Sequence, residues 1–210
     1  MSPFVRKVLW YVAEQGLAHT HQIIMPVGPQ PDWYRDISPL GKIPAITDGD
    51  YALADSSIIC AYLNDAYPQP YSLYPQSAPA LAQVRWLEKY ADEELAKVIT
   101  FGLFANRVLL PSMGMPADEK RLAAALAKLP KLFDYLEQAL GGAEYFVGNA
   151  FGLADVAIMS QWQNLRYAGE DIDAQRWPGL AAHADRMSER PAWQQLAHKE
   201  HSLLAQLGQQ

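Results

Sequence analysis

The hydroxyl of Ser2 is the first group in the chain that could do chemistry. Ser2 precedes Pro3, which is the pattern of a helix N-cap followed by the first helical residue. A hydroxyl at a helix N-terminus can stabilise an anion through one hydrogen bond and through the helix dipole. The simpler interpretation is that Ser2 only caps its helix.

The main chain around Ile43 is a second candidate for ligand binding. It lies in the stretch Ser38–Ile46, which holds two prolines and one glycine. A proline removes a ladder hydrogen bond, so Pro44 is expected at the edge of a strand or at a bend. A cis Ile43–Pro44 bond would turn the backbone of Ile43 outward, leaving its N–H and C=O free to pair with an extended peptide. The alternative is an ordinary turn that leads into a strand.

A third set of polar groups surrounds this stretch. Asp55 and Ser56 follow a Thr47–Asp50 turn and fit the start of a helix. A helix start can bind a carboxylate through a hydroxyl and free backbone N–H groups, while an aspartate can meet an amine. Lys42 is a candidate for a second carboxylate. The alternatives are a surface lysine and a helix cap with no ligand.

Strands are predicted only in the first third of the chain. Val5, Val8, Leu9 and Val12 recur at helical spacing after Ser2, and Gly16 is a suitable stop. We expect a strand over Thr20–Met25, a loop with at most one helical turn over Val27–Asp36, a hairpin of Ile43–Thr47 and Tyr51–Leu53 about the Asp48-Gly49 turn, and a helix from Asp55 or Ser56 to about Ala66.

Everything after a proline-rich linker is expected to be helical. The predicted domains are residues 1–68 and 79–210, with residues 69–78 as the linker. Strands in one part and helices in the other indicate two segregated modules. The expected helices are Ala80 to about Leu110, Ala117–Leu140 with a kink or interruption near Pro130, Leu153–Tyr167, Pro178 to about Glu189, and Pro191 to about Leu207.

Composition excludes several functional classes. The net charge of −6 and the absence of a long basic run argue against a nucleic-acid surface. Cys60 is the single cysteine, so no internal disulfide can form and a reducing compartment is expected. We see no apolar run of the ~20 residues that a membrane span needs, and no signal-peptide core. The sequence predicts a cytoplasmic protein that binds neither membrane nor nucleic acid.

Four motifs together resemble the cytosolic glutathione transferases, in particular the serine type found in bacteria. They are Ser2-Pro3-Phe4-Val5-Arg6-Lys7, the stretch Ser38–Ile46, Asp55-Ser56-Ser57-Ile58-Ile59, and Gly148–Asp155. The resemblance covers nearly the whole chain. It implies an α/β thioredoxin-like domain followed by an all-α domain. In the last motif Asp155 would form a capping box with the N-cap Gly152, where the family usually has Ser or Thr, and Phe151 and Val156 would form a hydrophobic staple.

The resemblance also implies roles for the candidate residues. Ser2 would stabilise the thiolate of glutathione, the co-substrate, and the Ile43 backbone beside Pro44 would pair with its cysteinyl unit. Asp55 and Ser56 would hold the γ-glutamyl end, and Lys42 the glycyl carboxylate. Many relatives have Glu at the position of Asp55. A small hydrophobic electrophile would lie between the modules, against Phe4, Tyr90, Phe101, Phe104 and Arg107, and the family usually forms homodimers.

One feature departs from the family pattern. A β-strand precedes the Ser-Pro-Phe segment in the family, whereas only Met1 precedes Ser2 here. The loss of that strand would leave Thr20–Met25 without its usual neighbour. We expect either a chain shortened at its start or a sheet that closes differently.

Other reactive side chains have weaker support. Asp92 could lie near the glutathione of a dimer partner, as acidic residues do in some relatives. The pairs His19 and His21, and His198 and His201, lack a third metal ligand, so no metal is predicted. Cys60 lies in an apolar stretch and is expected to be buried and inert.

The predicted function is detoxification by conjugation of glutathione to an electrophile. One alternative is a binding module of the same fold without turnover, which would carry apolar ligands or partners. Another keeps the enzyme but changes the reaction to glutathione-dependent peroxide reduction or isomerisation.

Overall fold

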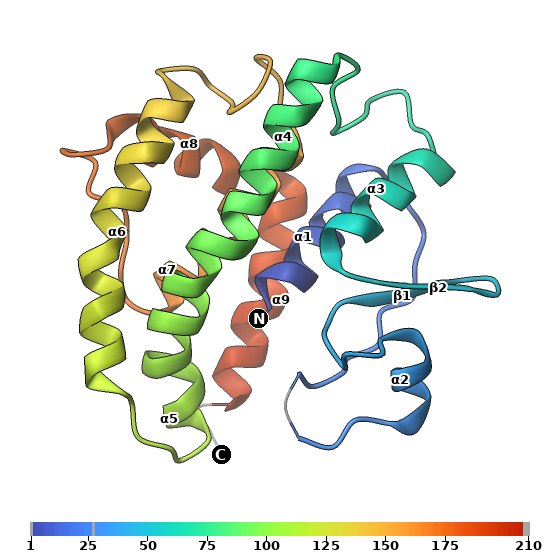
Figure 1. Cartoon of the computed structure of the whole chain (residues 1–210), viewed down its shortest axis with the longest axis horizontal. Helices are drawn as coiled ribbons and strands as arrows, with labels where there is room; N and C mark the ends of the chain where they lie inside the picture. Colours follow the sequence, from blue (N-terminus) through green and yellow to red (C-terminus); the bar gives the residue numbers. More distant parts are fainter. Residues whose placement is uncertain (1, 27, 208–210) are drawn as a thin grey trace.

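The computed structural model describes residues 2–26 and 28–207, with side chains described through Ser202. Met1, Val27 and residues 208–210 lie outside the described residues, and with them the first residue of the expected 27–36 loop. A small α/β module and a larger helical module lie side by side (Figure 1). The small module contains α1 (Pro3–Glu14), α2 (Asp32–Ile37), β1 (Ala45–Asp48), β2 (Tyr51–Ala54) and α3 (Ser56–Ala66).

Two elements of the small module begin and end as the sequence predicts. Ser2 is the N-cap of α1, and Gly16 follows the helix in the left-handed conformation with φ +63°. Asp55 is the N-cap of α3, which ends at Ala66. The segment of α2 runs slightly longer than the single turn expected there.

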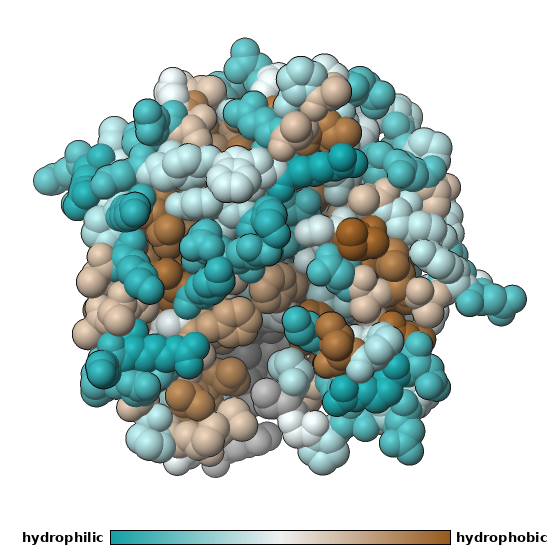
Figure 2. Space-filling model, in the orientation of Figure 1, coloured by the Kyte–Doolittle hydropathy of each residue, from teal (hydrophilic) through white to brown (hydrophobic). Residues whose placement is uncertain are grey.

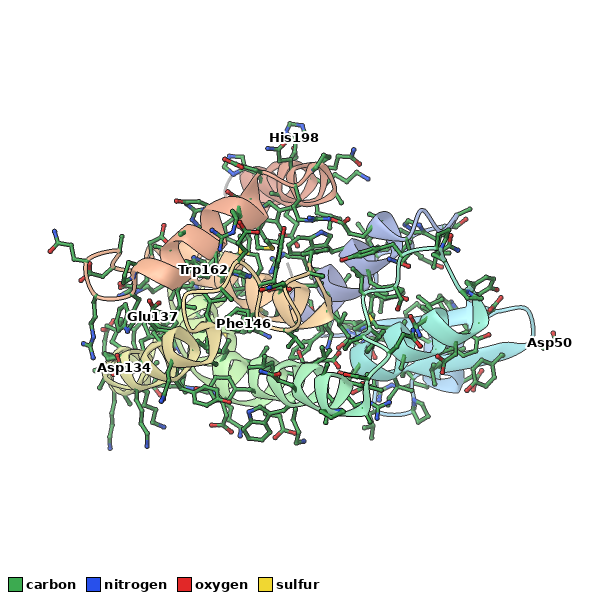
Figure 3. All side chains as sticks on the ribbon, turned by 90° about the horizontal axis from the view of Figure 1, so that it is seen from above. Asp50, Asp134, Glu137, Phe146, Trp162 and His198 are labelled. Carbon is green, nitrogen blue, oxygen red and sulfur yellow. The ribbon has the colours of Figure 1, made fainter. Side chains whose placement is uncertain are left out.

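The hairpin is confirmed, with shifted ends. β1 and β2 pair antiparallel with Ala45 opposite Ala54 and Asp48 opposite Tyr51, so the turn consists of Gly49 and Asp50 rather than Asp48 and Gly49. Figure 3 shows Asp50 at the outer tip of this hairpin. β1 starts only after Pro44, as expected for a residue that cannot donate to a ladder.

The expected strand over Thr20–Met25 was wrong. No strand is assigned to this segment, and among the described residues the sheet consists of β1 and β2 alone. A strand needs a hydrogen-bonded neighbour, and none lies beside this segment. Ile23 and Met25 are exposed by 63% and 55% instead of packing on a sheet face.

The helical module begins at a long helix. It consists of α4 (Ala78–Tyr90), the π-helical segment η1 (Ala91–Leu109) and α5 (Leu110–Ser112), followed by α6 (Glu119–Leu140), α7 (Leu153–Tyr167), α8 (Pro178–Ser188) and α9 (Pro191–Leu207). The expected interruption of α6 does not occur, because the helix continues through Pro130. The helix ends at Leu140, as predicted, and Gly141 follows it in the left-handed conformation.

The buried helix α7 lies at the centre of the packing. It contacts η1, α4 and α1, and η1 also packs on α6. Asp155 accepts the N–H of Gly152 at 2.9 Å, which is the predicted capping contact, and also the N–H of Phe146 at 3.1 Å. Phe151 and Val156, the expected staple pair, are both buried in the core.

The connection between the modules is packed rather than loose. Residues 67–77 contain neither helix nor strand, which agrees with a linker, and the exact domain bounds stay a prediction. Leu73 is 1% exposed, and its carbonyl accepts the N–H of Leu153 at 3.0 Å. The small module is therefore tied to the start of α7.

The helix Ala78–Ser112 is long and apolar enough to cross a membrane, by length and composition alone. This corrects the expectation of no such run. Half of its most apolar window is buried inside the protein. On the face drawn in Figure 2, brown patches lie scattered among hydrophilic side chains over both modules.

Candidate functional site

Ser2 lies at the N-terminus of α1 with its hydroxyl partly accessible. Its Oγ accepts the N–H of Val5 at 3.4 Å, so the hydroxyl hydrogen remains available for a ligand. Pro3 follows at the first helical position and is buried. The N-terminus of α1 thus offers both a hydroxyl donor and the positive end of a helix dipole.

Asp55 and Ser56 form a second helix N-terminus. The Oδ1 atom of Asp55 accepts the N–H groups of Ser57 at 3.0 Å and Ile58 at 3.2 Å. Asp55 has φ +82°, in the left-handed region that a residue with a side chain rarely adopts. This turn places Ser56 as the first residue of α3, where only 4% of it is exposed.

The loop before β1 is held by hydrogen bonds to its own carbonyl groups. The Lys42 carbonyl accepts the hydroxyl of Tyr34 at 2.8 Å and that of Ser38 at 2.7 Å. The Lys42 side chain is exposed, and Ile43 is half-buried. The Ile43–Pro44 bond is cis, as the sequence suggested. Within the part of the chain that the structure describes, no hydrogen bond engages the Ile43 N–H.

Lys7, which the sequence analysis did not single out, joins the two helix N-termini. Its Nζ donates to Ser57 Oγ on α3 at 3.0 Å. It also forms ion pairs with Glu88 on α4, at 2.9 Å, and with Asp92 on η1. The sequence did carry a signal for this cluster. Lys7 lies among the apolar positions of its helix, and Glu88 and Asp92 lie four residues apart on the long helix.

Charge and burial compete in this cluster. Burial lowers the pKa of Lys7, but Asp92 and Glu88 outweigh it, so the pKa stays above its ordinary value. Burial raises the pKa of Asp92, and Lys7 offsets only part of this effect. Asp92 is therefore engaged within its own chain, and the role toward a dimer partner that the resemblance implied stays a prediction.

The expected electrophile residues do not all lie together. Phe4 on α1 stacks on Phe101 of the long helix with ring centroids 6.4 Å apart, and Phe101 is 46% exposed. Arg107 is held by Glu170 at 2.6 Å. Phe104 is buried against Tyr167, and Tyr90 packs against Tyr135 of α6. Phe4 and Phe101 thus bring the two modules into contact at an accessible position, while Phe104 and Tyr90 face the helical module.

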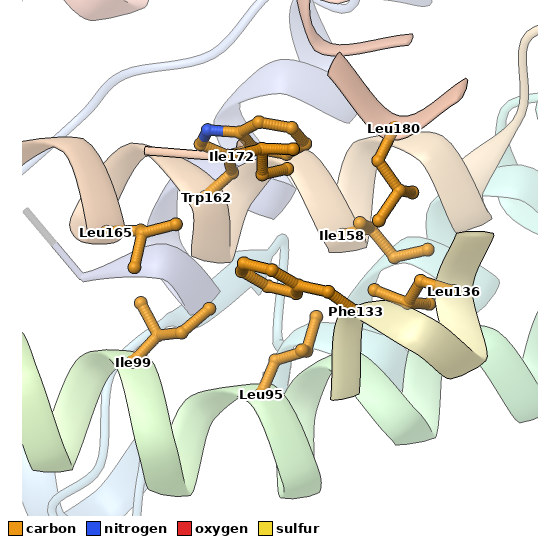
Figure 4. A pocket seen from close by; sticks show the side chains of 9 residues that line it. All are labelled: Leu95, Ile99, Phe133, Leu136, Ile158, Trp162, Leu165, Ile172 and Leu180. Atoms are coloured by element: carbon orange, nitrogen blue, oxygen red, sulfur yellow. The ribbon is translucent and has the colours of Figure 1, made fainter. Parts of the chain in front are cut away.

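A cavity in the structure lies elsewhere and is too small for a substrate. It has about 10 Å³, room for roughly one water-sized sphere. Figure 4 shows it inside the helical module between η1, α6 and α7. Its lining is apolar: Leu95, Ile99, Phe133, Leu136, Ile158, Trp162, Leu165, Ile172 and Leu180.

The weaker candidates remain separate from the site. His198 points away from the body of the molecule on α9 (Figure 3), and His19 and His21 lie in a segment to which neither helix nor strand is assigned. Among the described residues no cluster of three or more metal-ligating side chains is found. Cys60 is fully buried, and burial raises the pKa of its thiol far above the ordinary value.

Known proteins resemble the chain in both sequence and fold. Residues 1–71 match the family described as "Glutathione S-transferase, N-terminal domain", and residues 103–191 match "Glutathione S-transferase, C-terminal domain". Glutathione S-transferase F10 of Arabidopsis thaliana is 32% identical over 173 residues, which cover 81% of this chain and 79% of that protein.

More distant relatives agree. Glutathione S-transferase theta-1 of Homo sapiens is 29% identical, over 82% of this chain and 72% of its own. The crystal structure of glutathione transferase F2 from Populus trichocarpa has the same fold, with a TM-score of 0.83 at 22% identity, covering 96% of this chain and 95% of that one.

The fold is therefore that of a thioredoxin-like domain followed by an all-α domain, with a two-stranded sheet among the described residues. The chain belongs to the cytosolic glutathione transferase family, and its relatives in that family are named as transferase enzymes.

Proposed function

We propose that this transferase binds glutathione in an extended form along residues 42–44 and activates its thiol with Ser2. The observation that carries the proposal is the link between two helix N-termini. Lys7 on α1 donates to Ser57 on α3 at 3.0 Å, which holds the helix capped by Ser2 against the helix that begins with Ser56. Two positive dipole ends suit a ligand with an anion at each of two positions.

Each end of glutathione has a chemical partner in this arrangement. The γ-glutamyl carboxylate accepts from the Ser56 hydroxyl and the first N–H groups of α3, and the α-ammonium meets Asp55. The cysteinyl unit pairs with the main chain of Ile43, whose N–H is not engaged within the described residues. Lys42, which is exposed, takes the glycyl carboxylate.

The chemical step is attack by a thiolate. The Ser2 hydroxyl donates to the sulfur, so the thiol loses its proton to solvent more readily than the ordinary pKa of about 8.5 allows. Lowering that pKa by ~2 units takes roughly 2.7 kcal/mol, within reach of a charge-assisted hydrogen bond plus a helix dipole. The sulfur then bonds to an electrophilic carbon, and the displaced group leaves with its electron pair.

The electrophile is a small apolar molecule bound where the modules meet. The exposed ring of Phe101 and the ring of Phe4 offer an apolar surface beside the N-terminus of α1. The proposal also includes a cytoplasmic location and a homodimer, as is usual in the family. Sedimentation would test the homodimer. A peroxide as electrophile would leave the glutathione site unchanged and alter only the second substrate.

The test is Ser2→Ala, compared with Ser77→Ala. Ser77 caps α4 through a hydrogen bond from the N–H of Ala80 at 3.4 Å, the same length as the bond that Ser2 makes. Each variant should lose about 0.5–2 kcal/mol of stability from its cap. Only Ser2→Ala should raise the pKa of bound glutathione, measured by ultraviolet titration of the thiolate, and slow conjugation by about 10- to 100-fold at neutral pH. An unchanged thiol pKa and conjugation rate in Ser2→Ala would refute the role of Ser2.

A further inference from the structure

A buried cluster of charges lies directly behind the proposed glutathione site. The ammonium of Lys7, 1% exposed, meets the carboxylates of Glu88 and Asp92 and the hydroxyl of Ser57. A lysine ammonium has three N–H donors, and these three acceptors use all of them. Lys7 is therefore fixed in position by partners on three elements: α3, α4 and η1.

Ser57 is held from two directions. Its Oγ accepts from Lys7 at 3.0 Å and donates to Asp92 Oδ2 at 3.1 Å, which fixes the rotation of the hydroxyl. Its backbone N–H donates to Asp55 Oδ1 at 3.0 Å. The residue next to Ser56 is thus tied by its side chain to the long helix of the other module and by its main chain to the helix cap.

Stability alone does not account for such a cluster. Buried ion pairs often contribute little, because the loss of hydration offsets their attraction, and apolar residues of similar volume can replace them. A fixed geometry is the best-supported reason to keep buried charges. Here that geometry converges on the first turn of α3, where Asp55 and Ser56 lie.

We infer that Lys7 is a positioning residue for glutathione binding. Lys7 fixes the position of the first turn of α3 relative to α1 and to the long helix. The γ-glutamyl end of glutathione requires that position. The inference rests on the proposed function, since it concerns the same site. It adds a coupling between the modules: the affinity for glutathione depends on Glu88 and Asp92, which belong to the helical domain.

The first experiment uses Ser57→Ala, which removes the link to α3 but leaves both ion pairs of Lys7. KM for glutathione should rise by about 3- to 10-fold, the change for one lost hydrogen bond, with a smaller effect on kcat. Asp92→Asn, which keeps the shape but not the charge, should act in the same direction. The double variant should show less than the product of the two effects, because the two residues share one network.

Lys7→Arg and Lys89→Met serve as companion variants. Lys7→Arg keeps the charge and should retain more glutathione affinity than Lys7→Met, provided both fold. Lys89 and Glu93, which directly follow Glu88 and Asp92 in the sequence, form an exposed ion pair. Lys89→Met should leave KM for glutathione unchanged, because an exposed ion pair contributes little to stability and its partner Glu93 makes no hydrogen bond or ion pair with α3 among the described residues.

The outcomes separate this inference from the proposed function. If Ser56→Ala binds glutathione as tightly as the wild-type enzyme does, the site itself is misassigned. If Ser56→Ala weakens binding but Ser57→Ala and Asp92→Asn leave KM unchanged, Lys7 does not position the site. A lowered melting temperature with unaltered KM in those two variants would mark the cluster as structural only and would also overturn the inference.

Discussion

The helix side of the candidate site and its loop side are held by different kinds of contact. On the helix side, α1 packs against α7 and α3, and its Lys7 and Trp10 are fully buried. On the loop side, Lys42 and Ile43 are kept in place by hydrogen bonds from nearby residues of α2 and the loop itself. The helix side is part of the core of the protein, whereas the loop side is held by hydrogen bonds between neighbouring residues.

This difference has a consequence for how each side responds to substitution. A change on the helix side disturbs the contact between the two modules, so it should lower global stability as well as binding. A change on the loop side should loosen one segment and affect binding with little effect on global unfolding. Figure 1 shows the corresponding arrangement, with α1 and α3 on the upper side of the strands, toward the helical module, and α2 below the strands.

The largest effect is expected from removing the charge of Lys7. Lys7→Met leaves the carboxylates of Glu88 and Asp92 without their cation, at a cost of about 3–5 kcal/mol in the free energy of unfolding. Lys89→Met, which removes an exposed ion pair on the same long helix, should cost no more than ~1 kcal/mol. Urea denaturation of both variants measures the two values.

If Lys7→Met and Lys89→Met lower the free energy of unfolding by the same amount, the buried charges do not distinguish the helix side from the loop side. The contact between modules would then be held by apolar packing, such as that of Trp10 against Trp193 at 4.7 Å, and not by the buried charges.

A smaller effect is expected on the loop side. Tyr34→Phe removes one of two donors to the Lys42 carbonyl and should weaken glutathione binding by about 0.5–1.5 kcal/mol, and Ser38→Ala should weaken it by the same amount. Because each donor can partly substitute for the other, the double variant should raise KM for glutathione by more than the product of the single effects. Strict independence of the two variants would show that the carbonyl is held by other contacts.

The sequence predicted the helices whose ends are set by capping residues close to them in the chain. Ser2, Asp55 and Gly141 mark helix ends through local chemistry, and the structure has those ends. The strand over Thr20–Met25 depended on a distant partner, which local preference does not report. The segment was expected to form a strand, but among the described residues no neighbouring strand pairs with it.

The candidate site is readable from the sequence only in part for the same reason, and the roles of its residues stay a prediction. Ser2, Asp55 and Ser56 each lie at a local helix start, so their pattern is visible in sequence. Lys7 was missed because its partners are 50 to 85 residues away, and burial of a lysine follows only from tertiary contacts. Phe104 was expected beside the electrophile but packs into the core, since spacing on a helix cannot tell which face meets the second module.

The smallest effect concerns a polar link between the hairpin and α3. Asp48 at the end of β1 accepts the hydroxyl of Tyr62 at 2.8 Å and that of Tyr67 at 2.5 Å. The hydrogen bond to Asp48 raises the pKa of Tyr62 to about 12, and the two phenols lower the pKa of Asp48. Asp48→Asn should bring the pKa of Tyr62 back toward 10, measured by ultraviolet titration of tyrosinate.

The pH dependence of this link has a definite sign. The folded pKa of Asp48 is below its unfolded value, so its contribution to stability is present above about pH 4 and disappears as pH falls through the folded pKa. The wild-type protein and Asp48→Asn should therefore converge in stability in acid. Asp50→Asn, at the hairpin tip, removes the same charge from a residue that makes no hydrogen bond to either tyrosine among the described residues, and is the control. If Asp50→Asn shifts the titration of Tyr62 as much as Asp48→Asn does, general charge rather than the hydrogen bond links the loop side to the helix side.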